Sequence, residues 1–417
     1  MAFLRSLFSG VSGLRNHQTM MDVIGNNIAN INTVGFKAGR TTFSELYAQT
    51  LRSGTQPVDG SGGTNPMQVG LGITVNSLDT LFTQGNIENT GKTTDLAVQG
   101  NGFFIVKKDG KNLYTRVGTF DFDSTGTLVN TGTGAIVQGK LADAQGNIPS
   151  GTTLEDVKVA LDTKSPAKAT STMKFAGNLD SGAKVGDTAN ASVSVFDSLG
   201  NQHTITLTFT NTGTNAWSWK AAVPAPATTA AAGTVTFNTD GTLNSMTGNP
   251  LALTPGGGAN AMSINVDFGT PSAAAPGNFS GLTQTAGGST VTPREQDGYA
   301  AGTLSDISID STGKVQGTFS NGTVLTLAQI MMAEFNNPGG LVRNGENTYD
   351  ISGNSGTAAI ITPGQGSSVV SGALEQSNVD LADEFTRMIT AQRGFQANAR
   401  VITTSDEFLQ EVVNLKR

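Results

Sequence analysis

Both ends of the chain carry apolar residues at alternating spacings of three and four, which is the pattern of an α-helix with a coiled-coil seam. The first repeat covers residues 4–28 and includes only three charged residues, and the second covers residues 381–413. Because a solvated helix usually carries more charge, we expect the outer face of the first helix to be covered as well. Two such helices, flanking a strand-rich middle, are best buried against each other and against copies of themselves. The alternative, core-facing helices of one compact domain, is disfavoured because the repeats stand at opposite ends of the chain.

The apolar positions of the two repeats form the predicted assembly interface. Its members are Leu4, Leu7, Val11, Leu14, Met21, Ile24, Ile28, Leu381, Phe385, Met388, Phe395, Ile402, Leu409 and Val413. The first helix should end in the Asn-rich run over 26–32, because Asn side chains compete for backbone hydrogen bonds. Gly35 should then allow the chain to turn. Asn378 or Asp380 should cap the second helix.

Between the helices the sequence predicts short strands joined by tight turns. Residues 103–107 and 204–210 favour strands, and turn signals stand at 100–102, 109–110 and 199–201. We therefore predict an α+β fold, mainly β, in which discontinuous, coiled-coil-like terminal helices enclose two β-rich domains nested in the sequence. The predicted parts are a helical inner assembly domain (1–30 with 376–417), an extended connector (31–72), a first β domain (73–150 with 294–375) and an outer β domain (151–293).

The composition argues against several classes of function. Charged residues make up 14% of the chain, the net charge is −7 and no basic stripe with interleaved aromatics occurs, so we expect no nucleic-acid partner. The chain has no cysteine, which excludes a disulfide framework and a thiol nucleophile. The first residues lack a secretory signal and no run of about 20 apolar residues occurs, so we expect neither a cleaved signal peptide nor membrane insertion.

Motifs for catalysis or ligand binding fail on inspection. Residues 85–93 resemble a phosphate-binding loop, but five residues instead of four separate the glycines. Residues 121–132 begin like a calcium loop, but Gly132 stands where a bidentate Glu is needed, so a β-turn is the better interpretation. His17 and His203 show no spacing of a catalytic triad or a metal pair. The sequence predicts no enzyme activity, no cofactor and no metal site.

Four motifs, in order along the chain, resemble those of the flagellar rod and hook axial proteins. They cover residues 12–14 with 26–37, residues 94–104, residues 114–120 with 126–129, and residues 377–381 with 389–398. The family-motif residues of the first are Asn30, Asn32, Thr33, Gly35, Phe36 and Lys37. The resemblance covers both ends of the chain and the first β domain.

Within this family, the insertion over residues 151–293 resembles the hook type of member, and residues 196–203 resemble its outer-domain motif. The resemblance implies a structural subunit of the flagellar hook. Such subunits self-assemble into a curved, flexible tube, a universal joint that transmits motor torque from rod to filament and leaves an axial export channel. It also implies a homopolymer whose further partners are the rod protein, the hook cap protein and the hook–filament junction protein. The expected location is extracellular, in the hook and basal body, after export by the flagellar type III apparatus without a cleaved signal peptide.

Three alternatives stay open at the level of sequence. A distal rod protein or another flagellar axial subunit shares the terminal motifs, but the insertion over 151–293 argues against it. A secreted β-rich enzyme or adhesin would need a secretion signal or a catalytic cluster. Flagellin also has heptad-like terminal helices, but the motifs of the first β domain point away from it.

Overall fold

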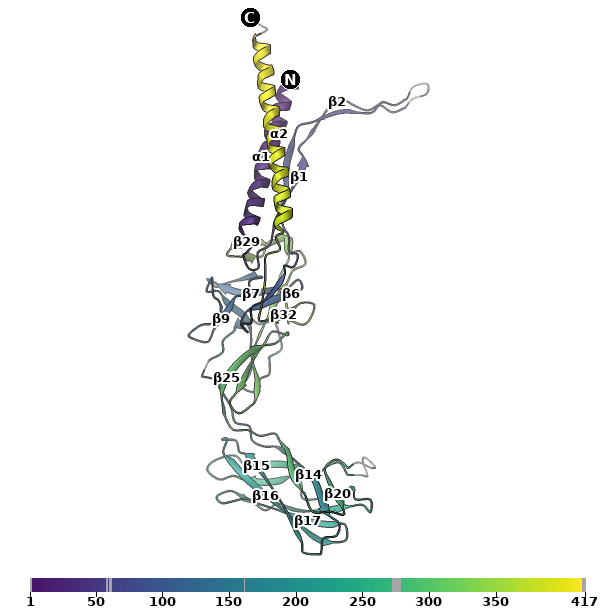
Figure 1. Cartoon of the computed structure of the whole chain (residues 1–417), viewed down its shortest axis with the longest axis vertical. Helices are drawn as coiled ribbons and strands as arrows, with labels where there is room; N and C mark the ends of the chain where they lie inside the picture. The colour runs from purple at the N-terminus through teal and green to yellow at the C-terminus, as the bar shows by residue number, and fades with distance from the viewer. Residues whose placement is uncertain (1, 58, 60–61, 161, 272–278, 415–417) are drawn as a thin grey trace. The chain divides into compact units, whose positions relative to one another are not determined.

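The computed structural model describes residues 2–57, 59, 62–160, 162–271 and 279–414. The fold is α+β and mainly β, with one long helix near each end of the chain, which confirms the predicted fold class (Figure 1). The chain divides into two compact units. Unit 1 comprises Met1–Ala160, Ile307–Gln316 and Thr326–Arg417, and unit 2 comprises Leu161–Asp306 and Gly317–Leu325.

In unit 1, helices α1 (Ala2–Ala29) and α2 (Leu381–Asn414) lie side by side and antiparallel (Figure 1). Helix α1 ends within the Asn-rich run, as predicted, and Gly35 then adopts a left-handed φ of +68°. The Asp380 side chain accepts a hydrogen bond from the Ala382 amide at 2.8 Å and therefore caps α2. Asn378 instead binds the backbone of Ala38 and Leu81.

The segment after α1, which includes the predicted connector over 31–72, folds back on itself. Strands β1 (Gly39–Glu45) and β4 (Ile73–Thr80) pair antiparallel, and so do β2 (Ala48–Arg52) and β3 (Met67–Gly70). We call residues 39–80 the hairpin arm; its β2–β3 end projects from the helices (Figure 1). Beyond β2 and β3, Thr55 and Thr64 form an antiparallel bridge that continues the pairing.

The rest of unit 1 is a β structure around a sheet with the strand order β27-β11-β7-β8-β30-β29. Two small antiparallel pairs, β5 with β33 and β6 with β32, join the segment before α2 to the segment after the hairpin arm. Edge-to-face aromatic contacts build its core, with ring centroids of Phe103 5.5 Å from Phe82 and 5.7 Å from Phe335. The elements are β5 (Ile87–Asn89), β6 (Leu96–Gln99), β7 (Phe103–Lys108), β8 (Lys111–Thr115), β9 (Phe120–Phe122), β10 (Leu128–Asn130), β11 (Ile136–Leu141), β12 (Glu155–Asp156), β27 (Val324–Ile330), β28 (Met332–Glu334), η1 (Pro338–Gly340), β29 (Val342–Gly345), β30 (Thr348–Asp350), β31 (Ala359–Ile361), β32 (Ser368–Ser371) and β33 (Ala373–Glu375).

Unit 2 contains two sheets that enclose one core. One sheet is antiparallel with the order β15-β16-β17-β19-β20, and the other is mixed, with β14 parallel to β22 and β23 and antiparallel to β24. Strands β25 and β26 contribute residues to both units. The remaining elements are β13 (Lys164–Ser165), β14 (Thr172–Asp180), β15 (Thr188–Phe196), β16 (Gln202–Gly213), β17 (Ala216–Ala222), β18 (Thr228–Thr229), β19 (Ala232–Phe237), β20 (Leu243–Met246), β21 (Leu251–Thr254), β22 (Met262–Asp267), β23 (Leu282–Thr285), β24 (Thr292–Gln296), β25 (Gly302–Ile309) and β26 (Lys314–Phe319).

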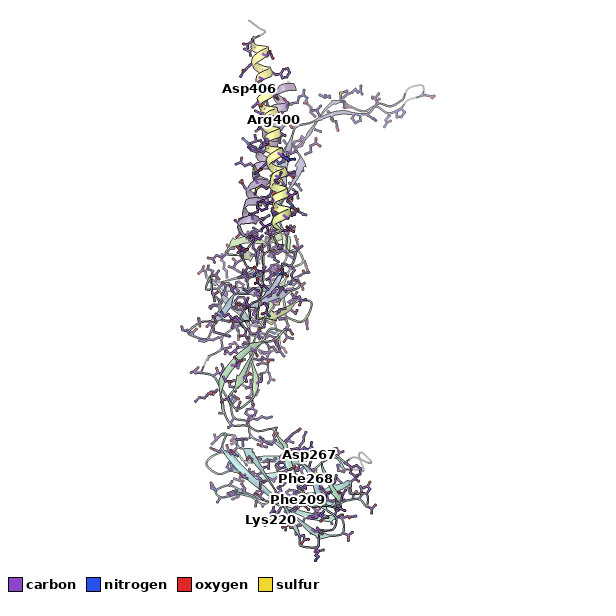
Figure 2. All side chains as sticks on the ribbon, in the orientation of Figure 1. Phe209, Lys220, Asp267, Phe268, Arg400 and Asp406 are labelled. Carbon is purple, nitrogen blue, oxygen red and sulfur yellow. The ribbon has the colours of Figure 1, made fainter. Side chains whose placement is uncertain are left out.

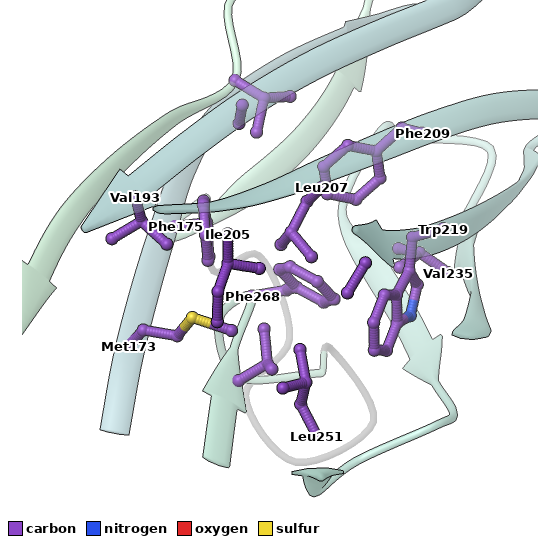
Figure 3. Close-up of a cluster of buried hydrophobic side chains, with 14 of the residues drawn as sticks. Met173, Phe175, Val193, Ile205, Leu207, Phe209, Trp219, Val235, Leu251 and Phe268 are labelled. Carbon is purple, nitrogen blue, oxygen red and sulfur yellow. The ribbon is translucent and has the colours of Figure 1, made fainter. Parts of the chain in front are cut away.

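Phe268 lies at the centre of the unit 2 core (Figure 3). Its ring centroid lies 5.9 Å from that of Phe175, 5.5 Å from that of Phe209 and 5.8 Å from that of Trp219. The first of these partners belongs to the mixed sheet and the other two to the antiparallel sheet. Phe268 therefore connects the two sheets of the unit.

We expect Phe268→Ala to lower the free energy of unfolding of unit 2 by about 3–5 kcal/mol, because it removes a buried aromatic ring and leaves a cavity. Both tryptophans of the chain, Trp217 and Trp219, are buried in unit 2, so intrinsic fluorescence during urea unfolding reports on this unit. Phe279→Ala is the matched control, since Phe279 is 57% exposed. Equal losses in the two variants would contradict the central role of Phe268.

Candidate assembly interface

The seam between α1 and α2 is built from small residues. Gly10, Gly13 and Gly394 all lie against the opposite helix. A Cβ atom on Gly13 would lie 2.7 Å from the Asn398 side chain, and one on Gly394 would lie 2.5 Å from Nε2 of His17. The helices therefore approach more closely than large side chains would permit.

Polar contacts stand at both ends of this seam. The hydroxyl oxygens of Ser6 and Ser405 lie 3.4 Å apart at one end, and Asn27 Nδ2 donates to Glu384 Oε1 at 3.1 Å at the other. Asn27 also bonds the amide and the carbonyl of Gly39, where the hairpin arm begins. Burial raises the pKa of the Glu384 carboxyl, and the hydrogen bond from Asn27 opposes that shift. A buried polar pair of this kind fixes the register of two helices.

The observed seam is displaced by one residue from the predicted repeats. Gly10, Gly13 and Asn27 face α2, whereas the repeat of three and four runs through their successors Val11 and Leu14. In α2 the displacement is partial: Gly394 and Asn398 face α1, but so does Ile402, which is a predicted position. Hydrophobic periodicity detects large apolar side chains and takes no account of glycines, so it does not locate a seam that glycines form.

The displacement leaves much of the predicted interface on the outside of the helix pair. Within one chain, Ile24 is buried; Leu7, Leu14, Met21, Ile28, Met388, Phe395, Ile402 and Leu409 are half-buried; Val11, Leu381, Phe385 and Val413 are exposed. The side chain of Leu4 lies outside the described residues. Arg400 and Asp406 are two of the charged residues in the second half of α2 (Figure 2). Whether the apolar positions contact other copies stays a prediction.

A buried ion triad joins the helix pair to the sheet of unit 1. Lys37 Nζ lies 2.6 Å from Glu375 Oε1, and Arg116 Nη1 lies 3.4 Å from Glu375 Oε2. All three side chains are at most 1% exposed. Lys37 also donates to the carbonyl of Thr83 at 2.8 Å, and the Gly85 amide donates to Glu375 Oε1 at 2.8 Å. The carboxylate is thus shared by two cations and a backbone amide.

Burial is the main electrostatic effect at the triad. It lowers the pKa of Lys37 and of Arg116, because the low-dielectric surroundings disfavour the charged forms. The Glu375 carboxylate opposes both shifts. Two buried cations around one carboxylate make the site sensitive to the loss of that carboxylate.

The family-motif residues form the turn that leads from α1 into this triad. Thr33 Oγ1 donates to Asn30 Oδ1 at 3.1 Å, and Asn32 is exposed. A Cβ atom on Gly35 would lie 2.9 Å from the Val117 nitrogen, so the close approach needs glycine in addition to its positive φ. The buried ring of Phe36 lies beneath the Arg343 guanidinium, 5.4 Å from ring centroid to Cζ.

Sequence reasoning missed two of the residues that hold this turn. Lys37 was singled out in the sequence, but Glu375, which supplies its counter-charge, was not. Arg343 donates to the Lys37 carbonyl at 2.6 Å and was also missed. A basic residue in an otherwise uncharged motif could have indicated that a buried acid exists, but not where in the sequence that acid stands.

Family models match four stretches of the chain. Residues 7–37 match the flagella basal body rod protein, and residues 97–164 match the flagellar hook protein FlgE/F/G D1 domain. Residues 169–299 match the flagellar basal body protein FlaE D2 domain, and residues 370–415 match the flagellar basal body rod FlgEFG protein C-terminal model.

Relatives match over nearly the whole chain. The flagellar hook protein FlgE of Borreliella burgdorferi is 41% identical over 99% of this chain and all of its own length, and that of Treponema pallidum is 40% identical with the same coverage. The chain belongs to the flagellar hook protein family. Membership makes it a structural subunit of the flagellar hook. The basal-body rod protein FlgG of Bacillus subtilis is 31% identical over 99% of this hook-family chain.

A solved structure agrees in fold. The Helicobacter pylori flagellar hook protein FlgE2 superposes with a TM-score of 0.53, covering 69% of this chain and all of that chain, at 14% sequence identity. Neither helix of the described chain is long and apolar enough to cross a membrane. Among the described residues, no three acidic or histidine side chains are grouped so that they could hold a metal ion.

We expect Gly13→Leu to destabilise the helix pair by about 1–3 kcal/mol, because the new side chain overlaps Asn398 and forces the helices apart. The measurement is thermal unfolding of the helical circular dichroism signal of the monomer. Gly25→Leu is the control: a Cβ atom there meets nothing within 4 Å, so this change should keep or raise helix stability. Similar melting of the two variants would refute the close-packed seam.

Glu375→Gln should lower the stability of unit 1 by about 3–5 kcal/mol, because it leaves two buried cations without a counter-charge. Amide hydrogen exchange of strands β6 and β33 measures the loss. Asp121→Asn, the same chemical change at the half-exposed pair with Lys92, should cost at most about 1 kcal/mol. A Glu375→Gln variant with unchanged protection would show that the triad is dispensable.

Proposed function

We propose that this hook subunit polymerises through its helix pair into a curved, flexible tube. In this proposal the tube acts as a universal joint, transmits motor torque from rod to filament and encloses an axial export channel. The observation that carries the proposal is the set of large apolar side chains on the outside of the helix pair. They are 38% to 69% exposed in a single chain: Phe8, Val11, Leu381, Phe385, Ile389, Val401, Phe408 and Val413. Exposed apolar surface on this scale is typical of a protein interaction site.

We assign different roles to the predicted parts of the chain. The helical inner domain (1–30 with 376–417) supplies the assembly free energy, since each large apolar side chain that becomes buried contributes about 1.5–3 kcal/mol. The first β domain (73–150 with 294–375) and the outer β domain (151–293) make the contacts farther from the channel. Between residues 204 and 293 only Lys220, Asp240 and Asp267 are charged, so contacts there are weak and non-ionic. Weak contacts let neighbouring copies slide as a curved tube rotates.

The ends of the polymer require other partners. We propose that the chain meets the rod protein at one end, the hook–filament junction protein at the other, and the hook cap protein during growth. We also propose that the chain is exported by the flagellar apparatus without a cleaved signal peptide. The role is structural and not enzymatic; the family of the chain supports this assignment.

We expect Leu381→Asp to raise the critical concentration for polymerisation by roughly 30-fold, equivalent to about 2 kcal/mol of lost burial. Leu381 is 41% exposed in the first turn of α2, where an acidic residue favours the helix, so the variant should keep its fold. Sedimentation and electron microscopy in assembly-promoting salt provide the measurement. Thr386→Asp, at a position that is already polar and exposed, is the control.

Electron microscopy of the unsubstituted chain tests the proposal as a whole. Curved tubes from the full chain, but not from a chain lacking residues 1–30 and 376–417, would support helix-driven assembly of a hook. Straight tubes would favour a distal rod protein. Normal assembly of the Leu381→Asp variant would overturn the role of the helix pair.

A further inference from the structure

A groove of about 490 Å³ lies between α1 and the base of the hairpin arm. Phe8 and Val11 line it from the helix, and Leu46 and Ile73 line it from the arm. Phe8 is 69% exposed and Leu46 is 46% exposed, so a single chain leaves this apolar surface open to water. Helix α2 of the same chain packs on a different side of α1, the side that carries Gly10 and Gly13.

Two arginines give the groove a positive charge. Arg5 and Arg15 are among its lining residues, and no acidic residue is. Arg5 donates to Gln49 Oε1 at 3.1 Å and so links α1 to the arm. Arg15 is exposed and forms no ion pair within the described part of the chain. The groove therefore suits an apolar segment that also carries negative charge.

The last turns of α2 have the complementary chemistry. Val401, Thr404, Phe408 and Glu411 follow at spacings of three and four, so they share one side of the helix. Val401 is 41% exposed and Phe408 is 60% exposed. No basic residue occurs between residues 401 and 414, whereas Glu407 and Glu411 both do, and neither forms an ion pair with any described residue.

The same chain cannot bring these two surfaces together. Because Ser6 faces Ser405 in an antiparallel pair, Glu411 lies beyond the described start of α1. Its distance from Val11 along the helix axis is about 16 Å, from eleven residues at 1.5 Å each. A contact between the end of α2 and the groove therefore needs a second copy.

We propose that the groove of one copy binds the Val401–Thr404–Phe408–Glu411 side of α2 of a neighbouring copy. This contact rests on the proposed function, assembly into a homopolymer. Phe408 enters between Phe8 and Leu46, and Glu411 at the acidic end of α2 lies against Arg5. Both surfaces lie at the same end of the helix pair. Two parallel neighbours can therefore meet with an axial offset of only about 8 Å, or roughly five helical residues.

Cysteine cross-linking tests the contact directly, because the natural chain contains no cysteine. The test variant is Arg5→Cys with Glu411→Cys, because the proposed offset brings these two positions level along the helix axis. Within one chain they lie on different helices and about 8 Å apart along the axis, so they cannot form a disulfide, which requires Cα atoms within about 7 Å. Mild oxidation of the polymer should give a ladder of covalent multimers on a denaturing gel, and oxidation of dilute monomer should give none.

The matched control is Arg5→Cys with Gln410→Cys. Gln410 is the exposed residue before Glu411 in α2 and points about 100° away from it around the helix. This pair should give few multimers.

Charge reversal gives an independent readout. Arg5→Glu and Glu411→Arg should each raise the critical concentration for polymerisation by about fivefold, and the two together should restore it. Polymers that form but show no cross-link at the 5–411 pair, or equal cross-linking at the 5–410 pair, would overturn this contact alone. If the unsubstituted chain never polymerises, the proposed function is wrong and the contact is wrong with it.

Discussion

The geometry of unit 1 depends on one buried carboxylate that two buried cations share. Glu375 stands just before α2, Lys37 just after the turn that ends α1, and Arg116 in the sheet region after β8. Removing such charges from water is costly, and the cost is offset only when all three segments are in place. The triad therefore couples the segment after α1, the segment before α2 and the sheet into one cooperative junction. The hairpin arm depends on the same junction, because it begins two residues after Lys37 and is bonded by Asn27 of α1.

In the helix pair, the small residues and the large apolar residues have different roles. Glycines in the seam let the helices of one chain approach closely, whereas eight large apolar side chains of the pair are 38% to 69% exposed. A protein that works as a monomer usually buries such side chains, because their burial contributes most of the hydrophobic stabilisation. On our proposal, the exposed side chains supply hydrophobic free energy for contacts between copies. This division accords with membership in a family of hook subunits.

The sequence predicts best those features that depend on residues close together along the chain. The helices, the end of α1 and the Asp380 cap are set by neighbouring residues, and all three were predicted correctly. In α1, Gly10 and Gly13 of the seam stand one residue before the predicted repeat, because glycines carry no weight in a hydrophobic pattern. The pairing of β2 with β3 joins two separate segments, and the composition of residues 31–72 does not specify it. Glu375 was missed because its partners stand 338 and 259 residues away in the sequence.

Unit 2 differs from the helix pair in where its apolar groups lie. Its aromatic residues meet around Phe268 in the interior, and its surface carries few charges between residues 204 and 293. Such a unit holds its own shape firmly but offers a neighbour little apolar area and few ion pairs. The helix pair offers the opposite, an outer face rich in large apolar side chains on a close-packed seam. On our proposal, a polymer of this chain is held together at the helices, and it can bend because the contacts between its outer β domains are weak enough to exchange.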